Sequence, residues 1–537
     1  MRRLRNLTIL LAALALGGSL VTGCGSDADD AGSSDASGAN PTSESSGPPN
    51  PAAFSGVDIP DGRIDEAVGR LDELANELME SSGLPGMAVA VVHGGQTVYA
   101  KGFGVREAGT DQKVDADTVF QLASMSKPVG STVVARQVDA GVVGWDTPVV
   151  SKLPGFALAD PWVTEHVTVG DLYSHRSGLP DHAGDHLEDL GYDQQQVLDK
   201  LRLDPLNPFR ITYEYTNFGL TAAAEAVAAA SGTDWATLSE QAIYGPLGMS
   251  STSSRFADYE ARSDRAVAHQ LVDGKYVADA VRNPDAQSPA GGVSSSVNDM
   301  GRWLAMLLAD GTFEGKEIVS PEALQPAVSP QIVSSPPRSM DSRPGSYGYG
   351  FNVSTTSAGR VSLSHSGAFQ LGVATNFVAI PSADVAIVAL TNGSPIGIPE
   401  TLTAEFADLV QYGEIREDWR SLYRQAISPM LDPEGSLVGQ TAPANPAPPQ
   451  QPLPTYAGTY DNPYWGPAIV TESNGALSLG LGPAGQTYPL THWDGDTFTF
   501  TLSGENAPPG TISKATFTGN DVTLEYYDTE GRGTFVR

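Results

Sequence analysis

Apolar and polar positions follow different periods along the chain, and each period predicts a different element. From Asp61 to Ser82, apolar side chains recur every three or four residues, which is typical of an amphipathic helix. The apolar runs Gly86–His93 and Thr97–Phe103 flank Gly94-Gly95, which predicts two strands joined in a hairpin. The chain therefore opens its folded part with a helix followed by a hairpin.

Two further helices are predicted behind recognisable starts. A helical pattern covers Val129–Gly141, and Pro128 suits a first helical turn because its missing N–H costs little there. Ser124 is therefore expected close to a helix N-terminus. Ser296 and Asp299 resemble a capping box that opens an apolar-faced helix.

The second half of this region returns to strand periods. Strands are predicted around Arg360–Ser364, Gly372–Ala379 and Val385–Thr391, and the N-terminal hairpin could complete their sheet. The last helix is expected from Glu400 to Val410. The simplest layout for residues 57–432 is an α/β sandwich with a separate helical lobe.

The C-terminal residues 455–537 have a different pattern, separated from the first unit by the Pro-rich linker 433–454. Thr497–Leu502 alternates strictly between polar and apolar positions, which is typical of a half-buried strand. Turn dipeptides recur at Asn474-Gly475, Asp494-Gly495 and Gly519-Asn520. About eight short strands fit this unit, enough for a small all-β barrel.

Composition excludes several classes of function. The 537 residues include 31 Lys and Arg against 63 Asp and Glu, a net charge of −32, which argues against a nucleic-acid partner. A hydrophobic fraction of 40% allows a large core. The single cysteine rules out an internal disulfide framework and a cysteine-based zinc site.

The position of that cysteine predicts export. Three arginines precede the apolar run Leu7–Val21, which is short for a membrane span and suits a signal peptide. The run ends in Val21-Thr22-Gly23-Cys24, which resembles the bacterial lipobox. The resemblance implies that residues 1–23 are removed and that Cys24 carries a lipid. Residues 24–56 have almost no apolar side chains and are expected to be a disordered tether.

We therefore expect the protein on the extracytoplasmic face of the cell membrane, held by a lipid anchor at Cys24. The alternative is a plain secretory signal in which the cysteine is incidental.

Candidate chemistry begins with Ser124-x-x-Lys127. An i, i+3 pair shares one helix face, so the lysine can reach the serine hydroxyl and help remove its proton. The helix N-terminus adds backbone N–H groups where an oxyanion would develop. About 0.7 such matches are expected by chance, so this motif alone is weak.

Two later motifs strengthen the prediction: Tyr215-Thr-Asn217 and His365-Ser-Gly367-Ala368. In this order the three motifs resemble the signatures of the serine β-lactamase and penicillin-recognising superfamily. The fuller resemblance is to its branch of class C β-lactamases, D-alanyl-D-alanine carboxypeptidases and related esterases and peptidases. It extends over about 60–410 and implies a mixed α/β fold of the β-lactamase/transpeptidase type. Further landmarks are Gly83–Val92, Asp171–Pro180, Tyr244–Met249, Pro289–Ser294 and Tyr347–Phe351.

The resemblance assigns roles to these residues. Ser124 would be the nucleophile, Lys127 its activating partner, and Tyr215 the general base and leaving-group acid. Asn217 would bind the substrate amide. The backbone N–H groups of Ser124 and Ala368 would form an oxyanion hole. Ser366 and Gly367 complete the substrate-binding strand, and no cofactor or metal is implied.

His365 departs from the pattern, because β-lactamases commonly carry lysine there. This puts efficient β-lactam hydrolysis in doubt and favours an esterase or a peptidase, including one that acts on D-amino-acid peptides. The reference pKa of histidine, about 6.5, suggests that activity shows an ionisation near neutrality that depends on His365. His175 is expected to be a structural residue that supports the site.

The C-terminal unit resembles the lipocalin-like domain appended to some peptidases of the same branch, at Tyr456–Tyr460 and Leu490–Trp493. Its role and the oligomeric state do not follow from the residues.

Several alternatives compete with this interpretation. Tyr460-Asp-Asn462, His93-Gly-Gly95 and His182-Ala-Gly184 repeat parts of the motifs, and the first two are expected to be incidental. Asp181–His186 could suggest a zinc site, but no cysteine is available and the other histidines are scattered. No G-x-S-x-G motif supports an α/β-hydrolase. A catalytically weak penicillin-binding sensor and a true class C-like β-lactamase remain open.

Overall fold

The structure is a computed structural model that describes residues 55–537, so Cys24 and almost all of the expected tether lie outside the described residues. The first unit is built on an eight-stranded antiparallel sheet in the order β2-β1-β14-β13-β12-β11-β10-β9. Its strands are β1 (Gly86–His93), β2 (Gln96–Gly104), β9 (Ile332–Ser335), β10 (Gly345–Tyr347), β11 (Asn352–Thr355), β12 (Val361–Phe369), β13 (Val373–Ile380) and β14 (Val385–Thr391). The predicted hairpin is confirmed, and it completes the sheet because β1 pairs with β14.

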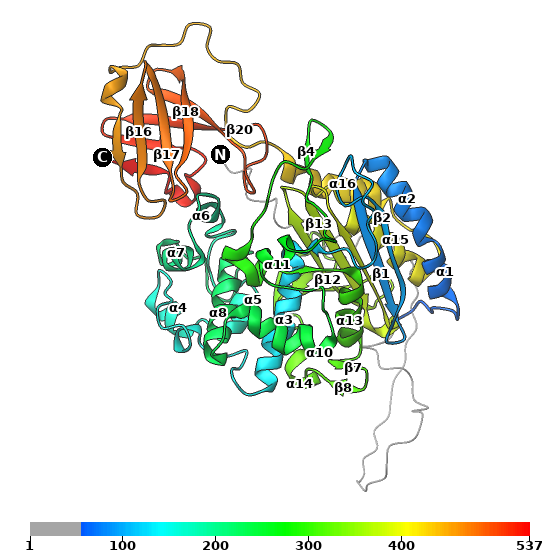
Figure 1. The fold of residues 1–537 in the computed structure, drawn as a ribbon. Coiled ribbons are helices and arrows are strands. Elements are labelled where there is room, and N and C mark those ends of the chain that lie inside the picture. Colours follow the sequence, from blue (N-terminus) through cyan, green and yellow to red (C-terminus); the bar gives the residue numbers. More distant parts are fainter. Residues whose placement is uncertain (1–54) are drawn as a thin grey trace.

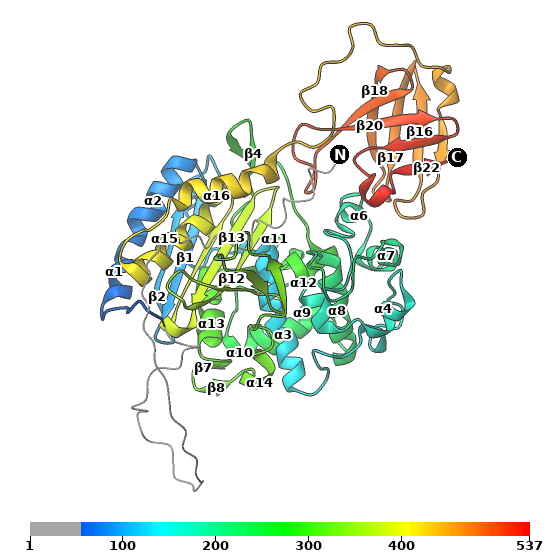
Figure 2. The ribbon, with the colours of Figure 1, turned by 180° about the vertical axis from the view of Figure 1, so that it is seen from behind.

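Helices cover both faces of this sheet (Figures 1 and 2). One face carries α1 (Arg63–Gly69), α2 (Leu71–Ser82), α15 (Ile398–Tyr412) and α16 (Trp419–Ile427). The other face carries α3 (Ser126–Asp139) and α13 (Val297–Leu308). Strand β14 is buried along its whole length because both of its faces are covered, which explains its continuous apolar run.

A helical lobe lies beyond α3, as the sequence predicts (Figure 1). Its helices are α4 (Pro161–His166), α5 (Val169–Tyr173), α6 (Asp185–Asp189), α7 (Gln194–Lys200), α8 (Asn217–Ser231), α9 (Trp235–Ser239), α10 (Gly245–Leu247), α11 (Phe256–Glu260), α12 (Ser288–Gly291) and α14 (Pro321–Leu324). Three short hairpins or ladders join β3 (Phe120–Gln121) to β6 (Ser294–Ser295), β4 (Gln270–Val272) to β5 (Lys275–Val277), and β7 (Thr312–Phe313) to β8 (Lys316–Glu317).

Three element predictions need correction. The single helix expected from Asp61 to Ser82 is two helices, α1 and α2, which meet at Arg70. A further helix, α16, follows the one expected to be last. The strand expected around Arg360–Ser364 is longer, because β12 continues through His365 to Phe369 and pairs with β13 from Leu363 to Phe369.

The C-terminal unit is an antiparallel meander of eight strands that nearly closes into a barrel (Figure 1). Asp461 at the start of the meander bridges to Val536 at its end. The interior is packed with buried aromatic side chains such as Trp465, Phe498 and Phe500. The strands are β15 (Gly458–Tyr460), β16 (Ala468–Ser473), β17 (Ala476–Leu481), β18 (Gln486–Asp494), β19 (Thr497–Leu502), β20 (Thr511–Thr518), β21 (Asp521–Leu524) and β22 (Thr534–Val536).

The barrel docks on the helical lobe through polar contacts. The loop between β19 and β20 carries Asn506, whose backbone N–H donates to Asp189 Oδ2 on α6 at 3.0 Å. Its neighbour Glu505 accepts from the backbone N–H of Gln370, just after β12, at 3.0 Å. Asn506 thus joins the barrel to the helical lobe, and Glu505 joins it to the end of β12.

None of the helices between residues 55 and 537 is both long enough and apolar enough to span a lipid bilayer.

Candidate active site

Ser124 lies in a tight turn that leads directly into α3. The turn is a 3₁₀ segment over Ala123–Met125, and α3 begins at Ser126. Ala123 has a φ of 48°, in the left-handed region that non-glycine residues seldom adopt. Ser124 is half-buried, whereas the residues on either side of it are buried. The local backbone therefore presents one hydroxyl at the start of the helix.

Lys127 is fully buried one turn along, and its Nζ contacts three oxygen atoms. These are Ser124 Oγ at 2.9 Å, Asn217 Oδ1 at 2.7 Å and the backbone O of Ala290 at 3.0 Å. Burial lowers the pKa of Lys127 to about 7, although Asp185 partly opposes this. A large share of Lys127 is thus neutral at neutral pH.

The geometry around Nζ sets the direction of proton transfer. The oxygens of Asn217 and Ala290 can only accept hydrogen bonds, so they take the two hydrogens of a neutral amine. As an ammonium, Lys127 Nζ donates to Ser124 Oγ as well. In the neutral amine, the lone pair is left facing that oxygen, so the Ser124 hydroxyl can donate to it. Lys127 can therefore act as the base that removes the Ser124 proton.

Tyr215 lies on the other side of the same hydroxyl. Its phenol makes a hydrogen bond with Ser124, and Lys127 Nζ lies 4.6 Å from its ring centroid. Burial raises the pKa of Tyr215 well above its usual value, so it is a neutral phenol at rest. These pKa directions favour Lys127 over Tyr215 as the base and leave Tyr215 as a proton donor.

Strand β12 approaches the nucleophile turn so closely that only glycine fits at Gly367. A Cβ there would lie 2.1 Å from the backbone O of Leu122 and 3.1 Å from the Ser124 nitrogen. Thr375, the β13 partner of Gly367, donates to the same Leu122 oxygen at 2.8 Å. The structure thus brings Gly367 and the adjacent Ser366 and Ala368 beside Ser124.

His365 is buried, and both of its ring nitrogens are engaged away from Ser124. Nδ1 donates to the backbone O of Ser366 at 2.6 Å, and Nε2 accepts from the hydroxyl of Tyr347 at 2.8 Å. Burial, with the nearby Lys127, lowers the pKa of His365 to about 3. The ionisation near neutrality expected of His365 is therefore wrong for this residue, because burial keeps its imidazole neutral through that range, whereas the pKa of Lys127 falls within it.

We predict that His365→Gln keeps the rise of activity through neutral pH. An active Lys127 must be deprotonated, so kcat/KM on a neutral ester should increase as the pH passes through about 7. His365 is neutral throughout this range and should not move the midpoint. The measurement is the pH profile of kcat/KM from pH 5 to 9; loss of the limb in the variant would return the titration to His365.

His175 packs against the ring of Tyr215, which fits the structural role expected of it. Its ring lies 4.5 Å from the Tyr215 ring and 5.0 Å from the Tyr347 ring, and its Nδ1 accepts from the backbone N–H of Thr216. The preceding turn is held by Asp171, a buried carboxylate bonded to two arginines (Arg176 and Arg210). The segment Asp171–Pro180 thus holds His175 in contact with Tyr215.

Sequence reasoning missed one side chain and one backbone carbonyl here, and it gave a further side chain the wrong interpretation. Tyr347, which orients His365, and the carbonyl of Ala290 lie within segments that the sequence flagged only as landmarks. Asp185 was considered only as part of a metal pattern. It accepts from Asn217 Nδ2 at 2.9 Å, at the back of the site.

Across residues 55–537, no three histidine, cysteine, aspartate or glutamate side chains gather in a way that could hold a metal ion. His182 bonds to Asp185, whereas His186 packs against Tyr526 of the barrel with ring centroids 4.8 Å apart. The two histidines of the suspected zinc pattern therefore contact different residues, one on α6 and one in the barrel.

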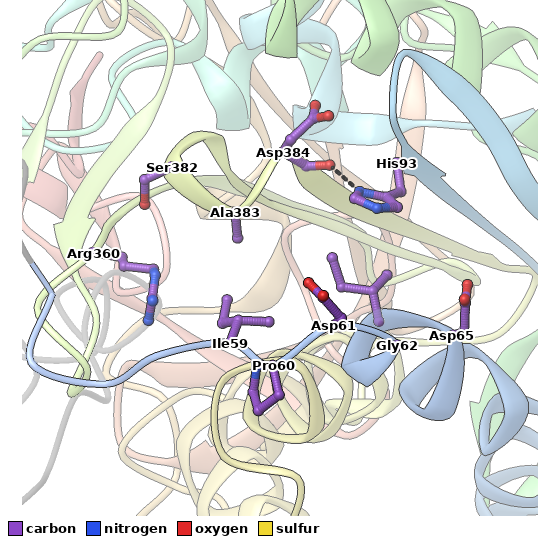
Figure 3. Close-up of a pocket in the computed structure, with 11 residues that line it drawn as sticks. Ile59, Pro60, Asp61, Gly62, Asp65, His93, Arg360, Ser382, Ala383 and Asp384 are labelled. Atoms are coloured by element: carbon purple, nitrogen blue, oxygen red, sulfur yellow. Dashed lines mark hydrogen bonds between the residues drawn. The ribbon is translucent and has the colours of Figure 1, made fainter. Parts of the chain in front are cut away.

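A separate hollow of about 480 Å³ lies at the other end of strand β1 (Figure 3). It contains His93, whose Nδ1 contacts the backbone O of Asp384 at 2.8 Å. None of the three motifs lines it, and Tyr460 of the second Y-x-N lies in the barrel. His93 and Tyr460 are thus placed away from Ser124.

Comparisons with known proteins agree with this geometry. An unguisins hydrolase of Aspergillus campestris is 27% identical over 413 residues, which cover 74% of this chain and 75% of the relative. Penicillin-binding protein 4 of Amycolatopsis lactamdurans is 28% identical over 390 residues, covering 70% and 93%. The octameric penicillin-binding protein homologue from Pyrococcus abyssi superposes with a TM-score of 0.58 at 20% identity, covering 88% of this chain and all of that one.

Family models divide the chain as the fold does. A domain of unknown function, DUF3471, matches residues 442–534, which hold the barrel. The model described as Beta-lactamase matches residues 71–410, which include Ser124, Lys127, Tyr215 and His365. The chain therefore belongs to the beta-lactamase family, whose fold is that of serine hydrolases.

Proposed function

We propose that the protein is an exported, lipid-anchored serine hydrolase that forms an acyl-enzyme at Ser124. The observation that carries the proposal is the 2.9 Å contact between Ser124 Oγ and a buried Lys127 whose pKa lies near 7. A serine hydroxyl needs such a base to become a nucleophile at neutral pH.

Acylation would begin with attack of Ser124 Oγ on the substrate carbonyl. The Ser124 proton passes to Lys127 Nζ, and the carbonyl oxygen becomes an oxyanion held by the backbone N–H groups of Ser124 and Ala368. Tyr215, hydrogen-bonded to Ser124, then donates its proton to the leaving amine or alkoxide and recovers one from Lys127. The leaving group departs with one proton, and Lys127 is neutral again.

Deacylation would reverse these roles with water as the nucleophile. Tyr215 and Lys127 together accept the water proton and return it to Ser124 as the acid product leaves. Asn217, bonded to Lys127, lies where it can also meet the substrate amide.

The proposed substrate is a peptide that contains D-amino acids, or an ester or amide of similar size. A neutral His365 supplies no cation for the carboxylate of a β-lactam, which argues against an efficient class C-like β-lactamase. The relatives named as a hydrolase and as a penicillin-binding protein support acyl transfer as the common chemistry.

Intact-mass analysis after a fluorophosphonate probe tests the proposal. The wild-type protein should gain one probe mass, and Ser124→Ala should gain none. An unlabelled wild type would favour a binding protein or sensor that keeps the pocket without the chemistry. A parallel incubation with benzylpenicillin reports whether a β-lactam acylates the same serine and whether it is released.

Tyr215→Phe is expected to keep the fold and lose turnover. The variant removes only the hydroxyl, so the leaving group loses the phenol that would relay the Lys127 proton to it, and kcat should fall by about 10²-fold or more. Thr216 and the ring contacts with His175 are kept. Steady-state turnover of an alkyl ester or an amide, whose leaving group must be protonated to depart, is the measurement; wild-type turnover of it in the variant would exclude Tyr215 from proton transfer.

Cys24→Ala is expected to release an active hydrolase from the membrane fraction. The proposed anchor is the acyl chain on Cys24, and the described helices offer no membrane span in its place. Detergent-phase partitioning of cells that express each form is the measurement. Equal partitioning of the variant and the wild type would contradict the lipid anchor, whatever the activity.

A further inference from the structure

A buried carboxylate, Asp185, lies behind the proposed base Lys127, and the side chain of Asn217 lies between the two. Asp185, at the start of α6, has a side chain only 4% exposed. Its Oδ2 accepts from Asn217 Nδ2 at 2.9 Å, and Asn217 Oδ1 accepts from Lys127 Nζ at 2.7 Å. None of the three family motifs contains Asp185. The acylation proposed above assigns no role to Asp185.

The carboxylate settles which way the Asn217 amide points. A carboxylate oxygen can only accept, so the amide must turn its Nδ2 towards Asp185 and its Oδ1 towards Lys127. With Oδ1 in that position, Asn217 takes one hydrogen of the amine and leaves the lone pair for Ser124. If the amide turned over, its NH₂ group would face Lys127 and compete with Ser124 for that lone pair.

A second donor reaches the same carboxylate oxygen. His182 Nδ1 lies 2.6 Å from Asp185 Oδ2, and its side chain is 43% exposed at the mouth of the site. Burial opposes the charge of His182, but Asp181 and the hydrogen bond to Asp185 outweigh it and raise its pKa to about 9. Asp185 thus stands between a cationic histidine and the amide that contacts the base.

We propose that Asp185 is a positioning residue for acylation, which holds Asn217 in the orientation that makes Lys127 a base and stabilises the ammonium that Lys127 becomes. A chain of hydrogen bonds runs from Ser124 through Lys127 and Asn217 to Asp185. In the step that activates the nucleophile, one proton moves, from Ser124 Oγ to Lys127 Nζ. Asp185 takes no proton in this step and acts through its charge and its hydrogen bond to Asn217.

Titratable groups from several elements surround Lys127 and affect its charge. Asp185 and His182 act on it from α6 and the turn before it, and His365 and His175 face it from β12 and the lobe. The other titratable groups around Asp185 include Asp181, His186, Tyr215 and Tyr464 of the barrel, and Arg532 of the barrel acts on His186. Of these, Asp185 is the group that raises the pKa of Lys127 against burial.

The test is the pH dependence of acylation in Asp185→Asn, measured as the rate of fluorophosphonate labelling from pH 5 to 9. Loss of the negative charge should lower the Lys127 pKa, so the midpoint of the rising limb should move down by about one pH unit. The plateau should fall about 10- to 100-fold because the ammonium loses its support. The loss should therefore be largest above pH 7 and smallest at low pH.

His182→Gln gives the opposite sign and keeps the carboxylate. Removing a cation near Lys127 should move the midpoint up, whereas general damage to the site would not shift the two variants in opposite directions. Asp189→Asn is the matched control, because Asp189 lies one turn further along α6 and bonds to Asn506 of the barrel. Its midpoint should equal that of the wild type.

Two results would overturn the proposal: an Asp185→Asn profile that superimposes on the wild type, or one that falls equally at every pH with the midpoint unmoved. If Asp185→Asn does not fold, an unshifted midpoint in His182→Gln overturns it as well. The proposal rests on the hydrolase chemistry proposed above, but the two fail differently. Wild-type protein that takes no label refutes the hydrolase, whereas labelled wild type with unshifted variants refutes only the role of Asp185.

Discussion

Lys127→Met is expected to abolish acylation of Ser124, with a loss of at least about 10³-fold in the rate of fluorophosphonate labelling. Lys127 is the base whose lone pair faces the Ser124 hydroxyl, and burial already holds its pKa near neutrality. Methionine fills a similar volume with no basic atom. Tyr215 cannot take over, because its raised pKa keeps it protonated over the working range.

A lysine elsewhere on the surface provides the control for this variant. Lys101 on β2 is half-exposed and pairs with Asp72 of α2 at 2.6 Å. This pair is not part of the site, so Lys101→Met should label at the wild-type rate. Thermal melting followed by circular dichroism establishes that both variants are folded. Labelling of a folded Lys127→Met at a rate within tenfold of the wild type would remove Lys127 from the role of base.

Gly367→Ala is expected to lose activity and stability together. The added methyl would lie 2.1 Å from the Leu122 oxygen and 2.3 Å from Thr375 Oγ1, and the first of these is backbone that cannot turn away. Strand β12 must therefore move off the nucleophile turn, which carries the Ala368 N–H away from its place in the oxyanion hole. We expect kcat/KM to fall about 10²- to 10³-fold and the free energy of unfolding to fall by about 1–3 kcal/mol.

Gly69→Ala is the matched control for Gly367→Ala, since a Cβ at Gly69 meets nothing within 4 Å and no positive φ is needed. Its activity should equal that of the wild type. Chemical denaturation and ester hydrolysis measure the two effects. A fully active Gly367→Ala would mean that β12 can shift without disturbing the site, and that the oxyanion hole does not depend on this contact.

Local patterns predicted most of the fold and most of the candidate site. The Ser124–Lys127 spacing and the position of Pro128 were enough to place both side chains at the start of one helix, because helical geometry is local. Tyr215, Asn217 and His365 could be gathered only through the resemblance to a family. Contacts between residues so far apart have no signature in the chain itself.

The protonation state of His365 was out of reach for a different reason. It depends on burial and on the nearby Lys127, which a reference pKa does not include. Asp185 was given the wrong interpretation because Asp and His at short spacings also suit a metal. Only the structure shows that its carboxylate faces an amide.

The docking of the barrel has a consequence for proteolysis of the chain. Residues 441–448 of the linker are exposed and are the natural place for a protease to cut. The barrel is nevertheless held by buried contacts of its own, including the ion pair of Arg532 with Asp204 and the bonds of Asn506 to Asp189. A cut in the linker would therefore leave a two-chain enzyme whose halves stay together. Its barrel would stay seated on α6, the helix that also carries Asp185.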